Sequence, residues 1–492
     1  MPAVRAAATD DRQHSADSAY TLNQRREVLL LTFITAAGAW LRFWHLGLKS
    51  LWLDEGATVT LAQASWERFA WIWWHGEASL QTIYFLFMRG WVHLGASEVW
   101  LRVPSALFGI ASIPVLYLLA RKLFGTAPAL AAAALLAFSP THIAYSQEAR
   151  SYTLSILLVL VSSYAFVRAV EYDRARDWAL WTVLGIAAFY SHDFTALVLI
   201  AQAASIFFAP RPAAWRRLVL CSVVILLAAL PGLSYVFRAT PENLHFAWMP
   251  KSSPREFLHL AMFFGGGGVK VAVATVLWIA GVVAICRSSD RGFVWRGTLV
   301  LLWATVPPAV LALISLHNPI FLQRYMIFSL PAMLLLAALG VQALSRYRLG
   351  PILVVGLCAM SLPTVFNDYH KPREDWRDAC HTIITSSAPG DAVAFFPFYT
   401  RIMFDYYGGT AAGQLQVFAP EYYAGGIDVR DLLQALDRDP HAFRHVWVVI
   451  AGNNGSLELF EHGATLQKKL ETTYGAPQSH RFADIEVLEF GL

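Results

Sequence analysis

The sequence has little charge for its length. Only 15% of its 492 residues are Asp, Glu, Lys or Arg, whereas soluble globular proteins carry about 25%. The net charge of +4 is divided among separate loops, so it gives no indication of a nucleic-acid partner. This composition excludes an ordinary soluble enzyme and turns attention to the apolar residues, which make up 57% of the chain.

Several familiar signatures are also missing. The chain has four cysteines, and their spacing matches no metal site; they are Cys221, Cys286, Cys358 and Cys380. The first three lie in or beside apolar runs, where cysteine usually acts as a small hydrophobe. The sequence contains no P-loop, no clean G-x-G-x-x-G and no internal repeat, so nothing in it indicates a nucleotide-binding domain.

Long apolar runs of the kind that span membranes recur along most of the chain. We expect a polytopic α-helical membrane protein with about 11 spans. The predicted spans are 28–48, 100–120, 127–144, 152–170, 178–191, 194–210, 217–237, 258–286, 297–316, 325–345 and 350–366.

Basic clusters between the runs mark cytoplasmic loops, and an odd number of spans places the two termini on opposite sides. We therefore expect a plasma (inner) membrane protein with its N-terminus in the cytoplasm and its C-terminus outside.

Two of the apolar segments are irregular. Residues 80–95, "LQTIYFLFMRGWVHLG", are short and carry Arg89 and His93, so we expect an amphipathic helix in the interface rather than a span. The 258–286 run is interrupted by "GGGG" at 265–268, and a kinked or broken helix is expected there.

The chain falls into three predicted regions. Residues 1–27 form a polar, Ala-rich cytoplasmic tail that we expect to be disordered, and 28–366 form the membrane module. Residues 367–492 are richer in charge, with apolar runs "GDAVAFFP", "HVWVVIAG" and "IEVLEF" that read as buried strands between helical segments. We expect them to form a small extracytoplasmic α/β domain.

An acidic pair, Asp54-Glu55, stands where the first apolar run ends, in "SLWLDEGAT". One interpretation is a pair of solvated loop carboxylates. The functional alternative is a general base or a metal ligand at the lipid–water boundary, where partial desolvation would raise a carboxylate's pKa and let it accept a proton from a hydroxyl.

Other polar residues fall on the same predicted face. The "YSQEARSY" loop places Gln147, Glu148 and Arg150 outside, and Arg324-Tyr325 follow "HNPIFLQ". Glu148 could simply stabilise the N-terminus of the next helix. Arg150 does not fit this explanation, because a cation is unfavourable at a helix N-terminus and arginine is rare in outside loops. Two such arginines indicate an anionic ligand, and phosphate suits the bidentate guanidinium best.

Carboxylates and arginines beside lipid suggest a substrate with a phosphate and a long hydrocarbon tail. A carboxylate would deprotonate an acceptor hydroxyl while an arginine holds the departing phosphate. This is glycosyl transfer from a polyprenyl-phosphate sugar, and it suits the outside face, where nucleotide sugars are absent.

Five segments carry a family resemblance: "LWLDEGATVTLA", "SEVWLRVPSALFGIASIPVLYLLARKLFG", "FSPTHIAYSQEARSYTL", "FYSHDF" and "EDWRDA". They resemble the GT-C superfamily, and within it the family 39-type membrane glycosyltransferases of bacteria, relatives of protein O-mannosyltransferases and of aminoarabinose lipid A transferases. The resemblance covers about residues 28 to 400.

The resemblance implies an inverting transferase and assigns roles to particular residues. Asp54 of the pair Asp54-Glu55 would be the catalytic base, Glu148 a second acidic site, and Arg324-Tyr325 the donor-phosphate site, with Arg150 as a further candidate. A divalent metal could bind beside paired acids, but the resemblance implies that no metal or other cofactor is needed. The donor would be a polyprenyl-phosphate sugar and the acceptor a lipid, a glycan or a protein, with membrane lipids around the chain.

Some assignments are less direct. Many relatives carry "PPL" where this chain has "ASLQTIYF" (78–85), which puts the substrate in question more than the reaction. His192-Asp193 would form a hydrogen-bonded turn or contact substrate, and the "WIWWH" cluster (71–75) an interfacial anchor or a sugar-stacking platform.

Two other functions compete with transfer. A lipid-linked sugar flippase or transporter would show ionisable residues at mid-span and two half-chain repeats, whereas here the charges are at span ends. A non-catalytic binding protein with the same fold would have little reason to keep Asp54, Glu148 and Arg324 together.

Overall fold

The computed structural model describes most of the chain. The described residues are 2–75, 81–210, 215–238, 253, 255–317, 320–345, 349–371, 373–420, 427–452, 457, 460 and 462–491, with side chains from 23 on, except 234–238. They form two compact units. The first comprises Met1–Trp44, Ser79–Tyr84 and Val103–Val365, and the second His45–Ala78, Phe85–Arg102 and Phe366–Leu492.

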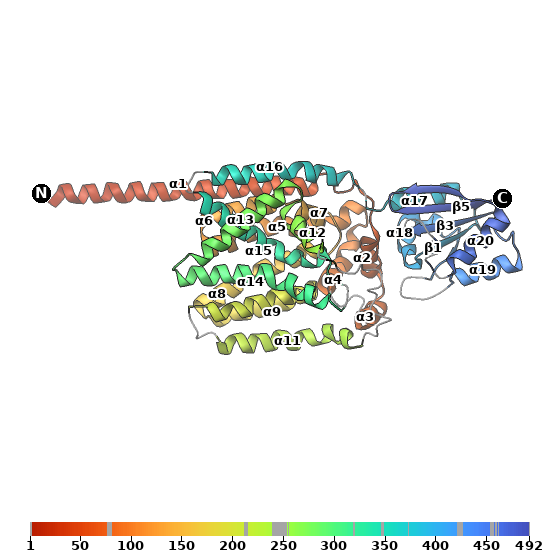
Figure 1. Cartoon of the computed structure of the whole chain (residues 1–492), viewed down its shortest axis with the longest axis horizontal. Helices are drawn as coiled ribbons and strands as arrows, with labels where there is room; N and C mark the ends of the chain where they lie inside the picture. The colour runs from red at the N-terminus through yellow and green to blue at the C-terminus, as the bar shows by residue number, and fades with distance from the viewer. Residues whose placement is uncertain are drawn as a thin grey trace. The chain divides into compact units, whose positions relative to one another are not determined.

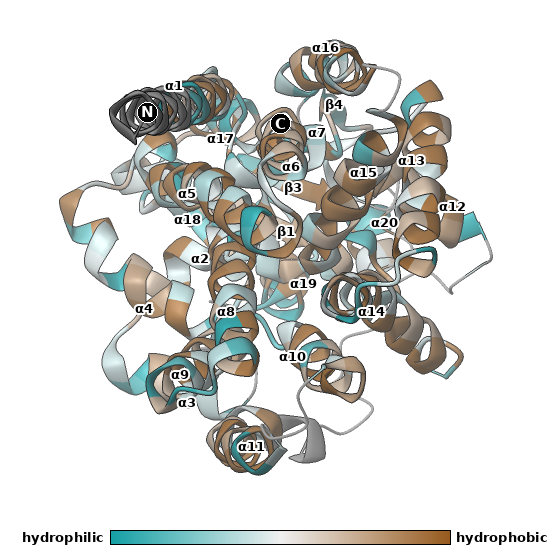
Figure 2. Cartoon of the chain, turned by 90° about the vertical axis from the view of Figure 1, so that its left-hand side faces the viewer, coloured by the Kyte–Doolittle hydropathy of each residue, from teal (hydrophilic) through white to brown (hydrophobic). Residues whose placement is uncertain are grey.

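The first unit is helical throughout its described part, and its helices are apolar along most of their length (Figure 2). Most of its elements are labelled in Figure 1. They are α1 (Pro2–Phe43), α5 (Glu98–Phe124, which begins in the second unit), α6 (Thr126–Ala137), α7 (Pro140–Ser146), α8 (Tyr152–Tyr172), α9 (Ala175–Ser191), α10 (Thr195–Ser205), η3 (Ile206–Phe208), α11 (Trp215–Arg238), α12 (Arg255–Gly265), α13 (Val269–Cys286), α14 (Arg291–Ile314), η5 (Gln323–Ser329), α15 (Leu330–Leu344) and α16 (Gly350–Tyr369, which ends in the second unit).

Every predicted span lies mostly in helix, but the count of eleven is not confirmed. Over the described part of the chain, seven helices are long and apolar enough to cross a membrane, or eight if the bent pair α6 and α7 counts as one. Three predicted spans are not among these candidates: the first, on α1, and those on α9 and α10, which have only 17 and 11 residues. The chain is a multi-pass membrane protein.

The break predicted within 258–286 is confirmed. Helix α12 ends at Gly265 and α13 begins at Val269. Gly266, Gly267 and Gly268 all have positive φ, between 58° and 82°, a conformation that glycine adopts without steric cost. A second break lies between α6 and α7, whose axes are bent by 56° relative to each other.

Helix α13 crosses α15 at very close range. A Cβ at Gly340 would lie 2.1 Å from Leu277 O, and one at Gly281 would lie 2.3 Å from Leu336 O. Small residues allow helix backbones to approach in this way within membranes.

The N-terminal tail differs from the prediction of disorder. Helix α1 runs from Pro2 to Phe43 without interruption, so the tail and the first predicted span are one helix. The physical reason is the tail's alanine content, because alanine has the highest helix propensity.

The second unit combines the C-terminal region with the first loop. Its elements are α2 (Leu53–Gln63), α3 (Trp66–His75), α4 (Thr82–Trp91, which begins in the first unit), η2 (Val92–Leu94), α17 (Trp376–Ser386), β1 (Ala392–Phe396), η7 (Phe398–Thr400), α18 (Arg401–Ala412), β2 (Gln416–Phe418), α19 (Val429–Arg438), β3 (His445–Ala451), α20 (Gly463–Tyr474), β4 (Gln478–Phe482) and β5 (Ile485–Gly491).

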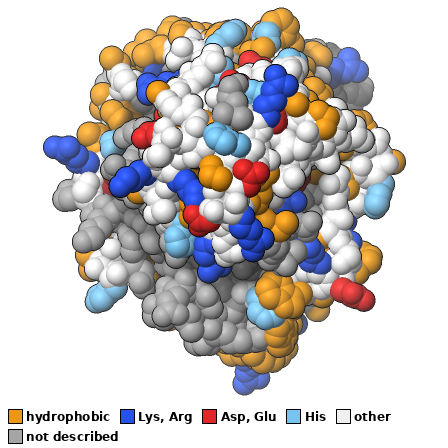
Figure 3. Space-filling model, turned by 90° about the vertical axis from the view of Figure 1, so that its right-hand side faces the viewer, with side chains coloured by type: hydrophobic (Ala, Val, Ile, Leu, Met, Phe, Trp, Pro, Cys, Tyr) orange, Lys and Arg blue, Asp and Glu red, His pale blue; other side chains and the backbone are white. Residues whose placement is uncertain are grey.

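The expected α/β domain is present. Its five-stranded sheet has the order β2-β1-β3-β5-β4; β1 is parallel to β2 and β3, and β5 is antiparallel to β3 and β4. The predicted strands are β1, β3 and β5, and the edge strands β2 and β4 complete the sheet. Figure 3 shows acidic and basic side chains mixed over one described face, with no large field of one sign.

The first loop packs against this domain. Helix α2 lies against α18, and a Cβ at Gly56 would lie only 2.3 Å from Met403 Sδ. Within the 80–95 segment, Thr82–Trp91 form α4 and Val92–Leu94 form η2. The ten residues of α4 extend about 15 Å. This length is too short to cross a membrane of about 30 Å, in agreement with the prediction that the segment is not a span.

Candidate active site

Asp54 and Glu55 lie in the first turn of α2. This position suits carboxylates, since the helix dipole and the free N–H groups at a helix N-terminus favour negative charge. Glu55 Oε2 also accepts a hydrogen bond from Trp52 N at 3.3 Å, in the manner of a capping box. The acidic pair therefore begins the helix, but the two carboxylates have different environments.

Glu55 is completely buried and is held by Arg102 of α5. Arg102 Nε donates to Glu55 Oε1 at 2.8 Å and Arg102 Nη2 donates to Glu55 Oε2 at 2.7 Å. The remaining guanidinium N–H groups donate to the carbonyls of Leu46, Lys49 and Ser50 at 2.8 to 3.0 Å. All five donors are used, so Arg102 connects α5 to the first turn of α2 and to the loop before it.

Asp54 is partly exposed. It is one residue away from the Glu55–Arg102 pair, so the paired neighbour fixes the helical turn that carries it. A base must reach its substrate, and of the two carboxylates only Asp54 has the required access. The geometry thus separates a carboxylate that is held by Arg102, Glu55, from one that a ligand can reach, Asp54.

Glu374, from the "EDWRDA" segment, approaches the same turn. Its Oε2 accepts hydrogen bonds from Leu53 N at 3.0 Å and from Trp376 Nε1 at 2.5 Å. Burial, together with the nearby charge of Asp54, raises the pKa of Glu374 above its usual range. The C-terminal domain therefore supplies a carboxylate to the start of the helix that carries Asp54.

A second polar cluster surrounds Glu98. Arg377 pairs with Glu98, and Tyr407 donates to Glu98 Oε1 at 2.5 Å. Tyr407 also accepts a hydrogen bond from Leu51 N at 2.6 Å. Burial and the bond to Glu98 raise the pKa of Tyr407 well above its usual value. The loop before α2 is therefore held from two directions within the second unit.

In the first unit, Gln147, Glu148 and Arg150 lie in the turn between α7 and α8. Glu148 is buried. Gln147 Nε2 donates to the carbonyls of Arg42 and Trp44 at 3.1 and 2.8 Å, so it holds the end of α1. Arg150 N donates to Glu148 O at 2.8 Å, which keeps the turn tight.

Four further predicted residues come together elsewhere in this unit. His192 Nδ1 lies 2.8 Å from Asp193 Oδ1, and the His192 ring centroid is 5.9 Å from that of Tyr325. Arg324 Cζ lies 5.5 Å from the centre of the Tyr325 ring. Tyr152, two residues beyond Arg150, also contacts His192, with ring centroids 5.8 Å apart.

The remaining predictions have mixed outcomes. In the described part of the chain, no group of three His, Cys, Asp or Glu side chains is arranged to hold a metal ion. Residues 78–80 of "ASLQTIYF" lie outside the described residues. The "WIWWH" cluster forms the end of α3, where Trp71 and Trp74 are about half exposed, at 49% and 53%.

Sequence reasoning missed Arg102, Glu374 and Tyr407. A signal existed for two of them: Arg102 interrupts an apolar run in "WLRVPSALFG", and Glu374 begins "EDWRDA". Nothing in the local sequence marks Tyr407 as a partner of the first loop.

Comparison with known proteins agrees with this architecture. The sequence profile of a family described as dolichyl-phosphate-mannose-protein mannosyltransferase matches residues 82–236. No curated protein sequence matches the chain.

Solved structures show the same fold. Two are ArnT from Cupriavidus metallidurans, bound to undecaprenyl phosphate and in the apo state. Their sequences are 14% and 15% identical, each with a TM-score of 0.56 and coverage of 93% of this chain and 97% of ArnT. A third is the Archaeoglobus fulgidus oligosaccharyltransferase in complex with Zn and sulfate, at 12% identity and a TM-score of 0.50, covering 92% of this chain and 73% of that protein. The chain has the fold of these GT-C glycosyltransferases.

Proposed function

We propose that this protein is an inverting membrane glycosyltransferase that moves a sugar from a polyprenyl-phosphate donor to an acceptor hydroxyl on the extracytoplasmic face. The observation that carries the proposal is the first turn of α2, where the buried Glu55–Arg102 pair fixes a partly exposed Asp54. The shared fold supports it, and one structure with that fold, ArnT, binds undecaprenyl phosphate.

The proposed reaction is a single displacement. Asp54 takes the proton of the acceptor hydroxyl as the oxygen attacks the anomeric carbon. The bond between that carbon and the phosphate oxygen breaks, and the polyprenyl phosphate leaves with the electron pair. Arg324 would bind this phosphate through its planar guanidinium, with Arg150 as a second cation and Glu148, His192 and Asp193 contacting the sugar or acceptor.

The proposed reaction can be tested even though the acceptor is unidentified. Lipids and glycans of a deletion strain should lack one sugar-bearing product, and wild-type protein should restore it. Asp54→Asn should not restore it, whereas Asp437→Asn, a change at an exposed carboxylate of α19, should. If all products are identical with and without the gene while lipid-linked sugar accumulates on one side of the membrane, a flippase would replace the transferase.

The proposed orientation places the N-terminus in the cytoplasm of the plasma membrane and the C-terminus outside. A reporter that is active only outside should be active when fused after residue 367 and silent when fused between Glu171 and Asp177. The opposite pattern would place the second unit in the cytoplasm, where a lipid-linked donor has no advantage over a nucleotide sugar.

A further inference from the structure

Lys270 of α13 is a buried cation in a predicted membrane span. It is only 6% exposed. Among the described residues, its ammonium donates to the Thr364 hydroxyl at 2.7 Å and forms no ion pair. Burying an ammonium costs several kcal/mol, and one neutral hydrogen bond returns only about 1 kcal/mol. Ionisable residues in this situation usually serve a ligand or a transport path.

The position within α13 adds to the cost. Lys270 is the second residue of the helix, where the helix dipole disfavours a cation. The helix N-cap, Gly268, provides no side-chain hydrogen bond, so the first N–H groups of α13 gain no side-chain acceptor there. An anion at this point would be stabilised by both the ammonium and the helix N-terminus.

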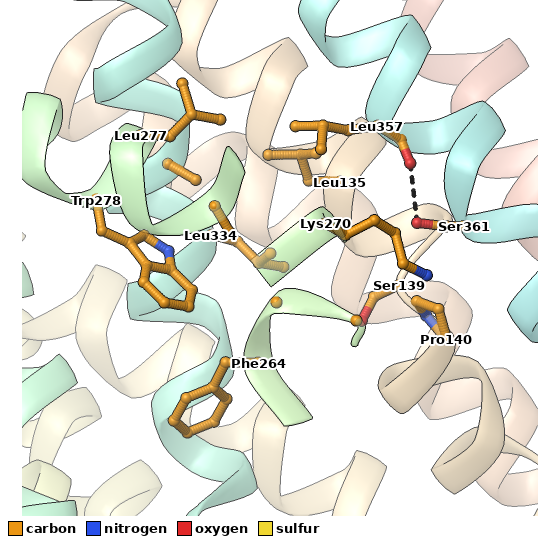
Figure 4. Close-up of a pocket in the computed structure, with 14 residues that line it drawn as sticks. Leu135, Ser139, Pro140, Phe264, Lys270, Leu277, Trp278, Leu334, Leu357 and Ser361 are labelled. Atoms are coloured by element: carbon orange, nitrogen blue, oxygen red, sulfur yellow. Dashed lines mark hydrogen bonds between the residues drawn. The ribbon is translucent and has the colours of Figure 1, made fainter. Parts of the chain in front are cut away.

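A pocket with a wide mouth and a cavity volume of about 50 Å³ lies beside Lys270. Figure 4 shows that its two ends differ in character. Phe264, Leu277, Trp278 and Leu334 form an apolar end, whereas Lys270 extends toward Ser139 and Ser361.

The serines at the polar end can add hydrogen bonds. Ser139 Oγ accepts a hydrogen bond from His142 N at 3.4 Å, so its hydroxyl proton remains available to a ligand. Ser361 Oγ donates to Leu357 O at 2.9 Å, which leaves its oxygen lone pairs free but not its proton. The polar end therefore offers an ammonium and a hydroxyl donor next to a helix N-terminus.

We propose that this pocket binds the phosphate of a chain-bearing lipid, with the phosphate on Lys270 and Ser139 and the chain against the apolar end. Lysine binds phosphate as a point charge, and a phosphate ester attached to hydrocarbon matches both ends of the pocket. The phosphate could belong to a membrane phospholipid or to a polyprenyl phosphate. The site uses none of the residues proposed for catalysis or for donor binding through Arg324.

The test measures lipid binding rather than transfer. Purified protein in phosphatidylcholine nanodiscs is titrated separately with phosphatidylglycerol, undecaprenyl phosphate and inorganic phosphate, and bound lipid is counted by native mass spectrometry. Lys270→Met keeps the side-chain length and removes the charge. Lys122→Met is the matched control, because Lys122 already has a carboxylate partner, Glu171, at 2.6 Å.

Wild type and Lys122→Met should bind at least one of the two anionic lipids saturably. Lys270→Met should bind one molecule of that lipid about ten- to hundredfold more weakly, while any undecaprenyl phosphate bound at the site proposed for Arg324 is unchanged. The lipid that shows this dependence identifies the source of the phosphate. Equal binding by wild type and Lys270→Met, or inorganic phosphate binding as tightly as the lipids, would overturn the proposal.

A stability measurement separates ligand binding from a structural role. In phosphatidylcholine alone, Lys270→Met should unfold at the same temperature as wild type or higher, since it removes a buried charge. A lower unfolding temperature would mean that Lys270 supports the fold. Because neither measurement requires transferase activity, failure here is distinct from failure of the proposed reaction.

Discussion

Two buried charges, one in each unit, are held in opposite ways. In the second unit, Glu55 is fully buried but shares two hydrogen bonds with Arg102, whose other donors are all occupied by carbonyl oxygens. In the first unit, Lys270 is almost as buried, and the Thr364 hydroxyl is its hydrogen-bond partner among the residues that the structure describes. A paired charge with every donor satisfied fixes local structure, whereas a buried charge held by one neutral hydroxyl has a place for a ligand.

The same contrast between a held and an accessible charge applies around Asp54. Glu55 is committed to Arg102, and Glu374 is committed to Leu53 N and Trp376. These groups surround the turn that carries Asp54, which remains partly exposed. We therefore expect substitutions to separate into two kinds: loss of reaction at Asp54 and loss of stability at the residues that hold it.

The largest expected effect is on catalysis. Asp54→Asn should reduce turnover by about 10² to 10⁴-fold, the usual contribution of a general base, because the amide cannot accept the acceptor's proton. The measurement is transfer by purified protein in nanodiscs, with the unfolding temperature as the check on folding. Near-wild-type turnover would remove Asp54 from the base role and leave Glu148 as the remaining candidate.

The next effect concerns the buried pair. Arg102→Met should destabilise the protein by about 3 to 5 kcal/mol, because it leaves the Glu55 carboxylate buried without its partner. The measurement is denaturant unfolding in detergent, followed by tryptophan fluorescence. Arg377→Met is the control: its pair with Glu98 is 42% exposed on the arginine side, so the loss should be much smaller.

A double variant sharpens this result. Glu55→Gln with Arg102→Met should recover part of the stability lost in Arg102→Met alone, because no charge is then left buried. The stability lost in the double variant is compared with the sum of the losses in Glu55→Gln alone and Arg102→Met alone. If the two are equal, Glu55 and Arg102 act independently and the ion pair does not hold the turn.

The sequence predicts some of these features because their signals are local. Asp54-Glu55 ends an apolar run, and β1, β3 and β5 are apolar runs of strand length, so each can be recognised from adjacent residues. Edge strand β2 has only three residues, and edge strand β4 has no buried residue. Neither has such a pattern, so the sequence did not predict them.

The partners of the first turn could not be predicted in the same way. Arg102 lies 47 residues from Glu55, and Glu374 lies 321 residues from Leu53. Their pairing depends on how the first loop packs against the C-terminal domain, for which periodicity and composition carry no information. Lys270 was missed because it stands at the broken end of an apolar run, where a lysine can also extend to the interface.

A smaller effect is expected at Arg324 in the first unit. Arg324→Lys keeps the charge but loses the planar, bidentate geometry, so affinity for a polyprenyl-phosphate donor should fall by about 1 to 3 kcal/mol. Arg324→Ala should lose more, and acceptor affinity should barely change. The measurement is donor-lipid binding in nanodiscs; equal donor affinity in all three proteins would exclude the phosphate role.

The smallest effect tests Glu374 through pH. Gln at this position keeps an oxygen acceptor for Leu53 N and Trp376 Nε1, so Glu374→Gln should preserve the turn near pH 5. Burial raises the pKa of Glu374 above its ordinary value of 4.5. A carboxyl whose pKa is raised by folding adds stability while it is protonated, and that contribution disappears as the pH rises through its folded-state pKa.

Wild type should therefore lose stability relative to Glu374→Gln as the pH increases from about 4.5. Unfolding temperatures of the two proteins, measured side by side from pH 4 to pH 8, give the difference directly. Asp437→Asn is the control, since that side chain is 70% exposed and should give a flat difference over the same range. A flat difference for Glu374→Gln as well would mean that Glu374 is solvated like Asp437. Its hydrogen bonds would then contribute little to holding the turn that carries Asp54.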